Sequence, residues 1–219
     1  MTSSVAAIIY GHEKDSFNEE DWTDTDAEGC SAYNKSKTYA EKAAWDFINS
    51  DECNMELSVI NPSLVLGPVL ESDFGTSVEL VKRFLNGGFP LAPNISFGIV
   101  DVRDVAQLHL LALESPQASG NRFIASSETL AIPLISEFLR KKIPEYQKRL
   151  PKGTAPDFLI KLLGFFSPLM KTVANQLGKT KELDNSKAKN ILGWQPRSGE
   201  EAVIASAKSL IEFDIVKSP

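Results

Sequence analysis

Tyr33 and Lys37 are two residues whose types and spacing could together carry out proton transfer. On a helix, side chains four residues apart lie on the same face, one turn above the other. A tyrosine phenol has an unperturbed pKa of about 10, so a tyrosine that exchanges a proton near neutral pH needs a cation beside it to stabilise the phenolate. Lys37 is placed to supply that cation. The pair therefore predicts a general acid accompanied by the charge that tunes it.

The same Tyr-x-x-x-Lys spacing occurs a second time in the chain, at Tyr10 and Lys14. Gly11 follows Tyr10, and the acidic stretch beyond it has no 3.6-residue pattern that would hold these two side chains on one face. From Ala32 to Ile48 the pattern is helical. Only the later pair is therefore predicted to be functional, and Tyr10 is interpreted as a wall residue of the site.

The predicted helix over Ala32 to Ile48 carries the pair in its first turns. Its helical pattern has two adjoining stripes that consist mostly of apolar and small residues. They are Tyr33, Lys37, Ala40, Ala44 and Ile48 on the first stripe and Tyr39, Ala43 and Phe47 on the second. The three alanines predict close packing of this face against a sheet or another helix.

Composition places the chain among soluble globular proteins. It has 219 residues, of which 42% are hydrophobic and 24% charged, and this is enough to bury a sizeable core. Its 23 basic and 29 acidic residues give a formal charge of -6. A nucleic-acid footprint would need clustered Lys and Arg, so no nucleic-acid partner is predicted.

The cysteines and histidines show no metal-binding spacing. Cys30 and Cys53 are predicted to be free thiols in a reducing compartment, and the distant His12 and His109 predict no metal. The most apolar window, Phe158 to Met170, is shorter than the roughly 20 residues of a spanning helix. No signal-peptide pattern opens the chain, so the expected location is cytoplasmic, away from membranes.

Strands and helices are predicted to alternate along much of the chain, which favours a parallel sheet with crossover helices. Asp101 and Asp104 are interpreted as a helix start rather than as catalytic groups. The segment Asn61 to Pro68 is interpreted as a loop. The predicted strands are Met55–Ile60, Ile95–Val100 and Arg122–Ser126, and the predicted helices are Ser77–Leu85, Asp101–Leu113, Ile132–Lys142, Asn185–Gly193 and Gly199–Ile211.

Several segments together resemble the extended short-chain dehydrogenase/reductases of the NAD-dependent epimerase/dehydratase superfamily. The likeness is strongest to the branch of dihydroflavonol reductases, cinnamoyl-CoA reductases and the yeast methylglyoxal and aldehyde reductases. The matching segments, in the family's order, are Thr2–Ala7, Tyr33–Lys37 with Ala40–Trp45 behind it, Asn61–Ser63 through Gly67–Pro68, Asp101–Ala106 and Leu192–Trp194.

The resemblance implies catalytic roles for three of these residues. Tyr33 would be the general acid that protonates a carbonyl oxygen as hydride arrives at the carbonyl carbon. Lys37 would stabilise the phenolate and hold the nicotinamide ribose hydroxyls, and Tyr33 would also bind the cofactor. Ser4 would donate a hydrogen bond to the same carbonyl oxygen as charge develops on it.

The resemblance also implies a cofactor and a fold. The cofactor would be NADP(H) in preference to NAD(H), with its nicotinamide ring against three consecutive residues, Pro62, Ser63 and Leu64. The fold would be α/β, the C-terminal portion of a Rossmann-type doubly wound parallel sheet plus a small, mostly helical substrate-binding domain. Residues 1–67 and 95–126 would form the first part, and residues 68–94 and 127–219 the second. Phe165, Phe166 and Met170 are expected to line a pocket for an apolar carbonyl substrate.

One part of the family pattern does not occur in these 219 residues. A glycine-rich turn between the first strand and first helix would hold the dinucleotide pyrophosphate. Family topology places four strands before the Ser4 segment, which at about 30 residues per unit is on the order of 100 residues. We therefore expect the sequence to be the C-terminal part of a longer reductase. Residues 1–219 alone are expected to show neither saturable NADPH binding nor turnover.

The predicted function is NAD(P)H-dependent reduction of a small aldehyde or ketone to an alcohol. A sugar-nucleotide epimerase or dehydratase of the same fold is a second hypothesis. Its pocket should carry basic residues for a diphosphate, whereas Lys161 and Lys171 lie among Phe, Leu and Met residues. A third hypothesis is a non-catalytic remnant that binds a partner through an exposed sheet edge. The sequence leaves the oligomeric state open.

Overall fold

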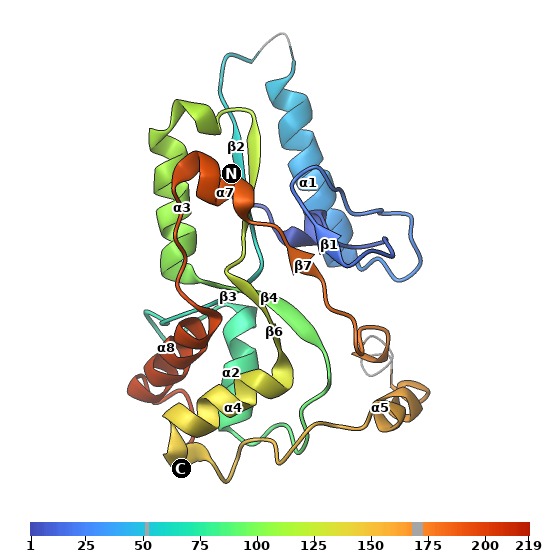
Figure 1. Ribbon diagram of the computed structural model, residues 1–219, viewed down its shortest axis with the longest axis vertical. Helices are drawn as coiled ribbons and strands as arrows, with labels where there is room; N and C mark the ends of the chain where they lie inside the picture. The colour runs from blue at the N-terminus through green and yellow to red at the C-terminus, as the bar shows by residue number, and fades with distance from the viewer. Residues whose placement is uncertain (51–52, 168–172) are drawn as a thin grey trace.

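The computed structural model describes residues 1–50, 53–167 and 173–219. Its main strands form two small sheets that follow one another along the long axis of the molecule (Figure 1). In the first sheet β2 (Ser58–Pro62) pairs in parallel with β5 (Asn121–Ala125). The N-terminal segment extends this sheet on the other side of β2, because Thr2 forms a parallel bridge to Ile60. The chain then turns into the 3-10 helix η1 (Val5–Ala7).

Helices cover the first sheet on both sides (Figure 1). Helix α3 (Val102–Glu114) packs on β2, and α7 (Ser186–Leu192) packs on β5. Helix α1 (Ala32–Ile48) lies on the opposite side and packs against η1. The core between α3, α7 and the sheet is built by buried apolar side chains, among them Ile60, Leu108, Phe123, Ala188 and Trp194.

The second sheet contains β3 (Leu64–Leu66), β4 (Ser96–Asp101) and β6 (Glu128–Ala131), with β4 in the middle. The β3–β4 pair is parallel and the β4–β6 pair is antiparallel. Ser63 alone separates β2 from β3, and only residues 126 and 127 separate β5 from β6. The two sheets are therefore joined at short crossings, so residues at these crossings lie between them.

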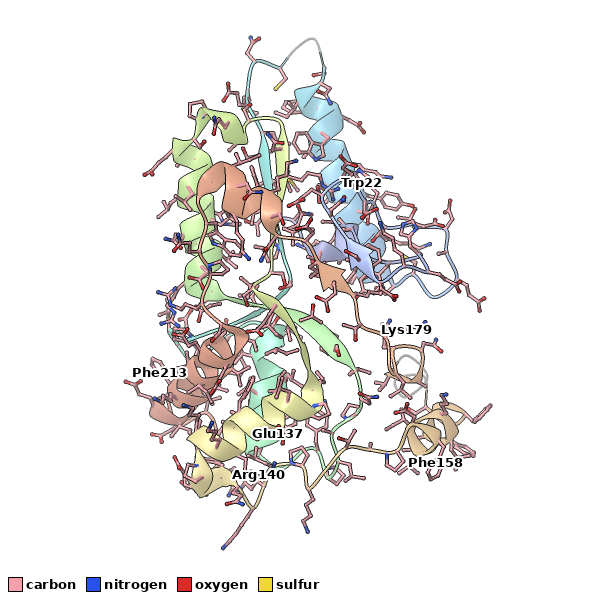
Figure 2. All side chains as sticks on the ribbon, in the orientation of Figure 1. Trp22, Glu137, Arg140, Phe158, Lys179 and Phe213 are labelled. Atoms are coloured by element: carbon pink, nitrogen blue, oxygen red, sulfur yellow. The ribbon has the colours of Figure 1, made fainter. Side chains whose placement is uncertain are left out.

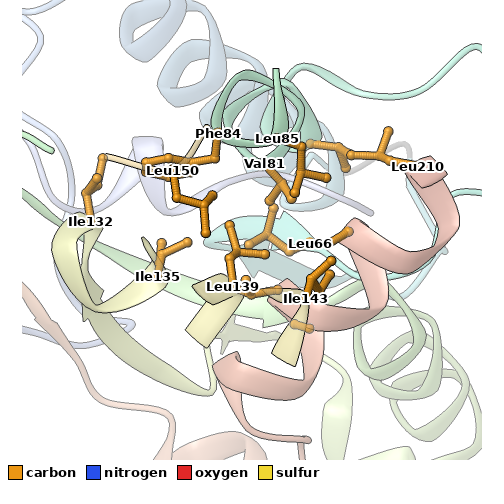
Figure 3. Close-up of a cluster of buried hydrophobic side chains, with 14 of the residues drawn as sticks. Leu66, Val81, Phe84, Leu85, Ile132, Ile135, Leu139, Ile143, Leu150 and Leu210 are labelled. Carbon is orange, nitrogen blue, oxygen red and sulfur yellow. The ribbon is translucent and has the colours of Figure 1, made fainter. Parts of the chain in front are cut away.

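Three helices close the core of the second sheet: α2 (Glu79–Leu85), α4 (Ile132–Lys142) and α8 (Gly199–Glu212). Figure 3 shows the apolar side chains that meet there, which include Leu66, Phe84, Leu85, Ile135, Leu139 and Leu210. Helix α8 begins with a capping box between Ser198 and Glu201. Such a box satisfies two backbone N–H groups that a helix start leaves open.

The remaining elements are short. Strand β1 (Ser16–Phe17) pairs in parallel with β7 (Glu182–Leu183). The described residues also include helix α5 (Asp157–Gly164) and the 3-10 helices η2 (Thr76–Val78), η3 (Pro116–Ala118) and η4 (Pro144–Tyr146). In the described parts of the chain, every helix is too short or too polar to cross a membrane.

Most of the predicted elements are confirmed. The predicted bounds of α1 and α4 match those of the structure, and the strands predicted over Ile95–Val100 and Arg122–Ser126 differ from β4 and β5 by one residue at each end. The predicted cap is also confirmed, because the Asp101 carboxylate accepts a hydrogen bond from the Arg103 N–H at 2.9 Å.

Two predictions about strands are wrong. The expected loop over Asn61 to Pro68 contains the last two residues of β2 and all of β3. The backbone of β3 pairs with β4, and its Leu66 is buried. Strand β6 was not expected, and its antiparallel pairing makes the second sheet mixed. Both strands are very short, so an alternating apolar pattern has no room to show itself in the sequence.

The expected packing face of α1 is also wrong. Ala40 and Ala43 are exposed, and the residues of α1 that are buried are the polar Asn34, Thr38 and Glu41. Two of these side chains have partners among the described residues, since Thr38 Oγ1 donates to Asn34 O at 2.8 Å and Glu41 forms an ion pair. Hydrogen-bonded polar residues can occupy a buried helix face, and an apolar pattern cannot reveal such a face.

The described part of the apolar window, residues 158–167, does not form the core or pocket lining that its composition favours. Helix α5 projects away from the rest of the fold, as the position of Phe158 in Figure 2 shows. Phe165 and Phe166 are 84% and 82% exposed, and Ile160 is the buried residue of α5. Met170, also expected to line the pocket, lies outside the described residues.

Candidate active site

Helix α1 presents Tyr33 and Lys37 in its first two turns. The helix starts at Ser31, whose side chain accepts a hydrogen bond from the Asn34 N–H at 3.1 Å. This cap fixes the first turn and therefore the place of Tyr33. The Tyr33 side chain is 57% exposed, and Lys37 is half-buried. Within residues 1–50, 53–167 and 173–219, neither the phenol nor the ammonium forms a hydrogen bond or ion pair, so both remain available to a ligand.

Ser4 lies at the turn from the N-terminal segment into η1. Its Oγ accepts a hydrogen bond from the Ala6 N–H at 3.1 Å and so caps the 3-10 helix. A hydroxyl that accepts this bond keeps its own proton for donation. Because η1 packs directly against α1, Ser4 lies close to this helix.

Pro62, Ser63 and Leu64 occupy the crossing from β2 to β3. Pro62 is buried opposite Ala125 of β5, and the Ser63 N–H donates to Ala125 O at 3.0 Å. Leu64 begins β3. The N-terminal segment and β2 run parallel, so Ser4 and Pro62 both lie at the carboxyl end of the sheet, the edge where open α/β sheets bind ligands.

A direct hydrogen bond links these segments. Asn61 Nδ2, next to Pro62, donates to the backbone oxygen of Ser4 at 3.3 Å. The structure therefore brings the Ser4 segment and the Pro62 crossing together at one edge of the first sheet, and α1 packs against η1, which follows Ser4. These are the three segments on which the predicted catalytic and cofactor-binding residues lie.

Tyr10 borders this region. Burial raises the pKa of the Tyr10 phenol, and the nearby Tyr33 phenol and Cys30 thiol raise it further. The Lys181 ammonium lies 4.6 Å from the centre of the Tyr10 ring and donates to Ile9 O at 2.6 Å. A phenol with a raised pKa stays protonated near neutral pH, which favours the interpretation of Tyr10 as a wall residue.

Lys181 was not found by sequence reasoning. It comes from the segment before β7, far along the chain from Tyr10. Burial lowers the pKa of its ammonium. An isolated lysine in a polar stretch carries no signal of such a contact, because the contact depends on the pairing of β1 with β7.

Gly98 of β4 gives a test of how tightly the Ser63 crossing is packed. A Cβ atom added at Gly98 would lie 2.5 Å from Leu183 Cδ1, 2.8 Å from Ser126 Oγ and 3.1 Å from Ser63 Cβ. Gly98→Ala is therefore expected to lower the free energy of unfolding by about 1–3 kcal/mol through overpacking, measured by urea denaturation. Gly153→Ala is the matched control, since a Cβ there meets nothing within 4 Å. Equal stabilities of the two variants would contradict this packing.

Glu19 gives a test of the buried polar groups beside β5. Its carboxylate accepts a hydrogen bond from the Ile124 N–H at 2.9 Å. Burial raises the pKa of Glu19, and the hydrogen bond offsets part of that increase. A carboxyl whose pKa is raised by folding contributes stability below its unfolded pKa and loses it as the pH rises through its folded pKa.

Glu19→Gln keeps an oxygen acceptor for Ile124 and removes the charge. The difference in Tm between this variant and the wild type is expected to become more positive as the pH rises from about 4 to about 7. Glu20→Gln, at an exposed neighbouring position, serves as the control. The same pH dependence in both variants would show that burial of Glu19 is not the cause.

Two cavities in the described structure lie apart from the predicted residues. One, of about 610 Å³, is lined by residues 127–128, Lys189 and residues 193–198, and the other, of about 290 Å³, by residues around Gly67 and Phe74. Neither includes Ser4, Tyr33 or Lys37. Over the same described ranges, no group of three His, Cys, Asp or Glu side chains could hold a metal ion, and Cys30 and Cys53 are free.

Comparison with known proteins identifies the family. The model of the NAD dependent epimerase/dehydratase family matches residues 1–125, more than half of the chain. The chain is 32% identical over 231 residues to the NADPH-dependent methylglyoxal reductase of Saccharomyces cerevisiae, covering 98% of this chain and 63% of that protein. It is 35% identical over 191 residues to a ketoreductase of Aspergillus niger, covering 82% of this chain and 51% of that protein.

A solved structure agrees with these matches. The crystal structure of yeast methylglyoxal/isovaleraldehyde reductase Gre2 complexed with NADPH superposes with a TM-score of 0.76 at 29% identity, over 97% of this chain and 63% of that one. The chain thus spans less than two thirds of the length of these relatives, and its fold is of the α/β Rossmann type. The chain belongs to the NAD-dependent epimerase/dehydratase family, on the branch that contains the yeast methylglyoxal and aldehyde reductases.

Proposed function

We propose that this chain supplies the proton-delivering part of an NADPH-dependent reductase that converts small aldehydes or ketones to alcohols. The observation that supports the proposal is that α1, which carries Tyr33 and Lys37 in its first turns, packs against η1, the turn that follows Ser4. The exposed Tyr33 phenol and the Lys37 ammonium, which has no ion-pair partner among the described residues, suit a site that receives both a substrate oxygen and ribose hydroxyls.

The chemistry follows from these side chains. Bound NADPH would supply the hydride. Tyr33 donates its proton to the carbonyl oxygen, and Lys37 stabilises the phenolate that results. The Ser4 hydroxyl donates a hydrogen bond to the same oxygen while negative charge builds on it. Pro62, Ser63 and Leu64 form the surface against which the nicotinamide ring would rest.

The relatives support the cofactor and the substrate class. One matched relative is named as NADPH-dependent and as a methylglyoxal reductase, another as a ketoreductase, and the solved neighbour is described as complexed with NADPH. On that basis we propose NADPH as the cofactor and a small carbonyl compound as the substrate of this chain. We also assign residues 1–67 and 95–126 to the cofactor-binding part and residues 68–94 and 127–219 to the substrate-binding part. Free Cys30 and Cys53 support a cytoplasmic location.

The experiment measures NADPH oxidation by the complete native polypeptide that contains this chain. Methylglyoxal and isovaleraldehyde serve as substrates, and a nucleoside-diphosphate sugar serves as the competing substrate. We expect NADPH consumption that depends on the aldehyde and leaves the sugar nucleotide unchanged. Interconversion of the sugar nucleotide without net NADPH consumption would overturn the proposal in favour of an epimerase. No turnover of any of these substrates would refute it as well.

A further inference from the structure

Glu41 is a charged residue in the buried face of α1, two turns after Tyr33 and one turn after Lys37. Its side chain is fully buried, whereas the other buried residues of this helix, Asn34 and Thr38, are uncharged. A buried carboxylate is costly unless it is paired and hydrogen-bonded. The position of α1 therefore depends on where the partners of Glu41 lie.

The Glu41 carboxylate has three partners, each from a different segment of the first sheet. Arg122 Nε of β5 donates at 2.5 Å, Asn61 Nδ2 of β2 donates at 2.7 Å, and the Ser3 hydroxyl of the N-terminal segment donates as well. Charge-assisted hydrogen bonds of this kind are among the stronger ones in proteins. One carboxylate thus fastens α1 to all three segments of the sheet.

Two of these partners are chain neighbours of residues in the candidate active site. Ser3 precedes Ser4, and Asn61 precedes Pro62. Asn61 Nδ2 is shared between the Glu41 carboxylate and the backbone oxygen of Ser4. The carboxylate is therefore one residue away from the Ser4 turn and from the Pro62 crossing, while its own helix carries Tyr33 and Lys37.

Arg122 is itself held on its other side. Its Nη1 donates to Glu19 O at 2.8 Å and to Asp21 O at 2.7 Å, and its guanidinium lies 3.9 Å from the centre of the Trp22 ring. A guanidinium fixed in this way cannot follow the carboxylate if α1 shifts. The network therefore fixes the position of α1 on the sheet and its rotation about its own axis.

We propose that Glu41 is a positioning residue for carbonyl reduction. Its carboxylate fixes α1 relative to the Ser3–Ser4 turn and the Asn61–Pro62 crossing. The Tyr33 and Ser4 hydroxyls can then both donate hydrogen bonds to the same carbonyl oxygen. This inference rests on the proposed reductase function. Glu41 touches neither substrate nor cofactor; it acts through the placement of the residues that do.

The test compares variants of the complete native polypeptide. Glu41→Gln keeps the size of the side chain and removes its charge. Glu41→Met combined with Arg122→Met removes both buried charges, so no charge is left unpaired and folding is retained. Asp46→Asn is the matched control, because Asp46 is an exposed acid on the same helix. For each protein we measure Tm, the fraction of molecules that bind NADPH, and kcat for the aldehyde per NADPH-binding site.

We expect kcat per binding site to fall by about tenfold to a hundredfold in both Glu41 variants, because displacement of catalytic groups by about 1 Å costs rate on that scale. The double variant is expected to recover Tm relative to Glu41→Gln but not kcat. Asp46→Asn should match the wild type in both quantities.

A merely structural role predicts a different result. It would lower Tm and the NADPH-binding fraction in Glu41→Gln and leave kcat per binding site unchanged. The double variant would then restore Tm and the binding fraction. That outcome, with an active wild type, would refute the positioning role and leave the proposed function intact. A wild type without aldehyde-dependent NADPH oxidation would refute both.

Discussion

Tyr33→Phe is expected to lower kcat for aldehyde reduction by about 10²- to 10⁴-fold, the usual contribution of a positioned general acid. The substitution removes only the hydroxyl, and the ring stays at its exposed place in the first turn of α1. Because the Tyr33 hydroxyl forms no hydrogen bond within the described parts of the chain, its removal should not disturb the fold. NADPH binding, which would depend on Lys37 and on Pro62 to Leu64, should stay nearly unchanged.

Tyr39→Phe is the matched control for this prediction. Tyr39 lies on the same helix, is also exposed, and its hydroxyl donates to Thr25 Oγ1 at 3.2 Å. We expect its kcat to equal that of the wild type. The measurement is single-turnover and steady-state reduction of isovaleraldehyde, together with an NADPH fluorescence titration of each variant. Comparable turnover in Tyr33→Phe and Tyr39→Phe would rule out the acid role of Tyr33.

The location of α1 could be predicted from the sequence, but the face on which it packs could not. Helical spacing and the cap at Ser31 are local properties, so the bounds of the helix are encoded in its own residues. Packing of α1 depends on Glu41 and its partner Arg122, which are 81 positions apart in the chain. Nothing at either residue distinguishes a buried ion pair from two solvated charges until the fold brings them together.

The candidate site shows the same division between local and distant information. Tyr33 and Lys37 could be identified from residue type and spacing, and Ser4 and Pro62 to Leu64 from a family resemblance. Their meeting at one sheet edge depends on the parallel register of Thr2 with Ile60 and of β2 with β5. The expected contribution of Phe165 and Phe166 was wrong because apolar composition alone does not say which way α5 projects.

Trp194→Ala is expected to lower the free energy of unfolding by about 3–5 kcal/mol, the usual cost of removing a large aromatic side chain from a core. Trp194 is fully buried in the cluster that contains Leu108 and Ala188, and its indole N–H donates to Asp104 O at 2.9 Å. Urea denaturation of the variant measures the change. Leu113→Ala on α3 is the control, because Leu113 is 83% exposed and should change stability by no more than about 0.5 kcal/mol.

The effect of this substitution should be confined to stability. The cluster around Trp194 is built from strands β2, β4 and β5, helices α3 and α7 and their flanking turns. It contains no residue of α1. We therefore expect Trp194→Ala to leave kcat per NADPH-binding site unchanged at temperatures where the variant is folded, in contrast to Tyr33→Phe. A loss of less than about 1 kcal/mol, well below the range for buried aromatics, would contradict the assignment of Trp194 to this core. A fall in kcat per site would mean that the core of α3 and α7 also controls the position of α1.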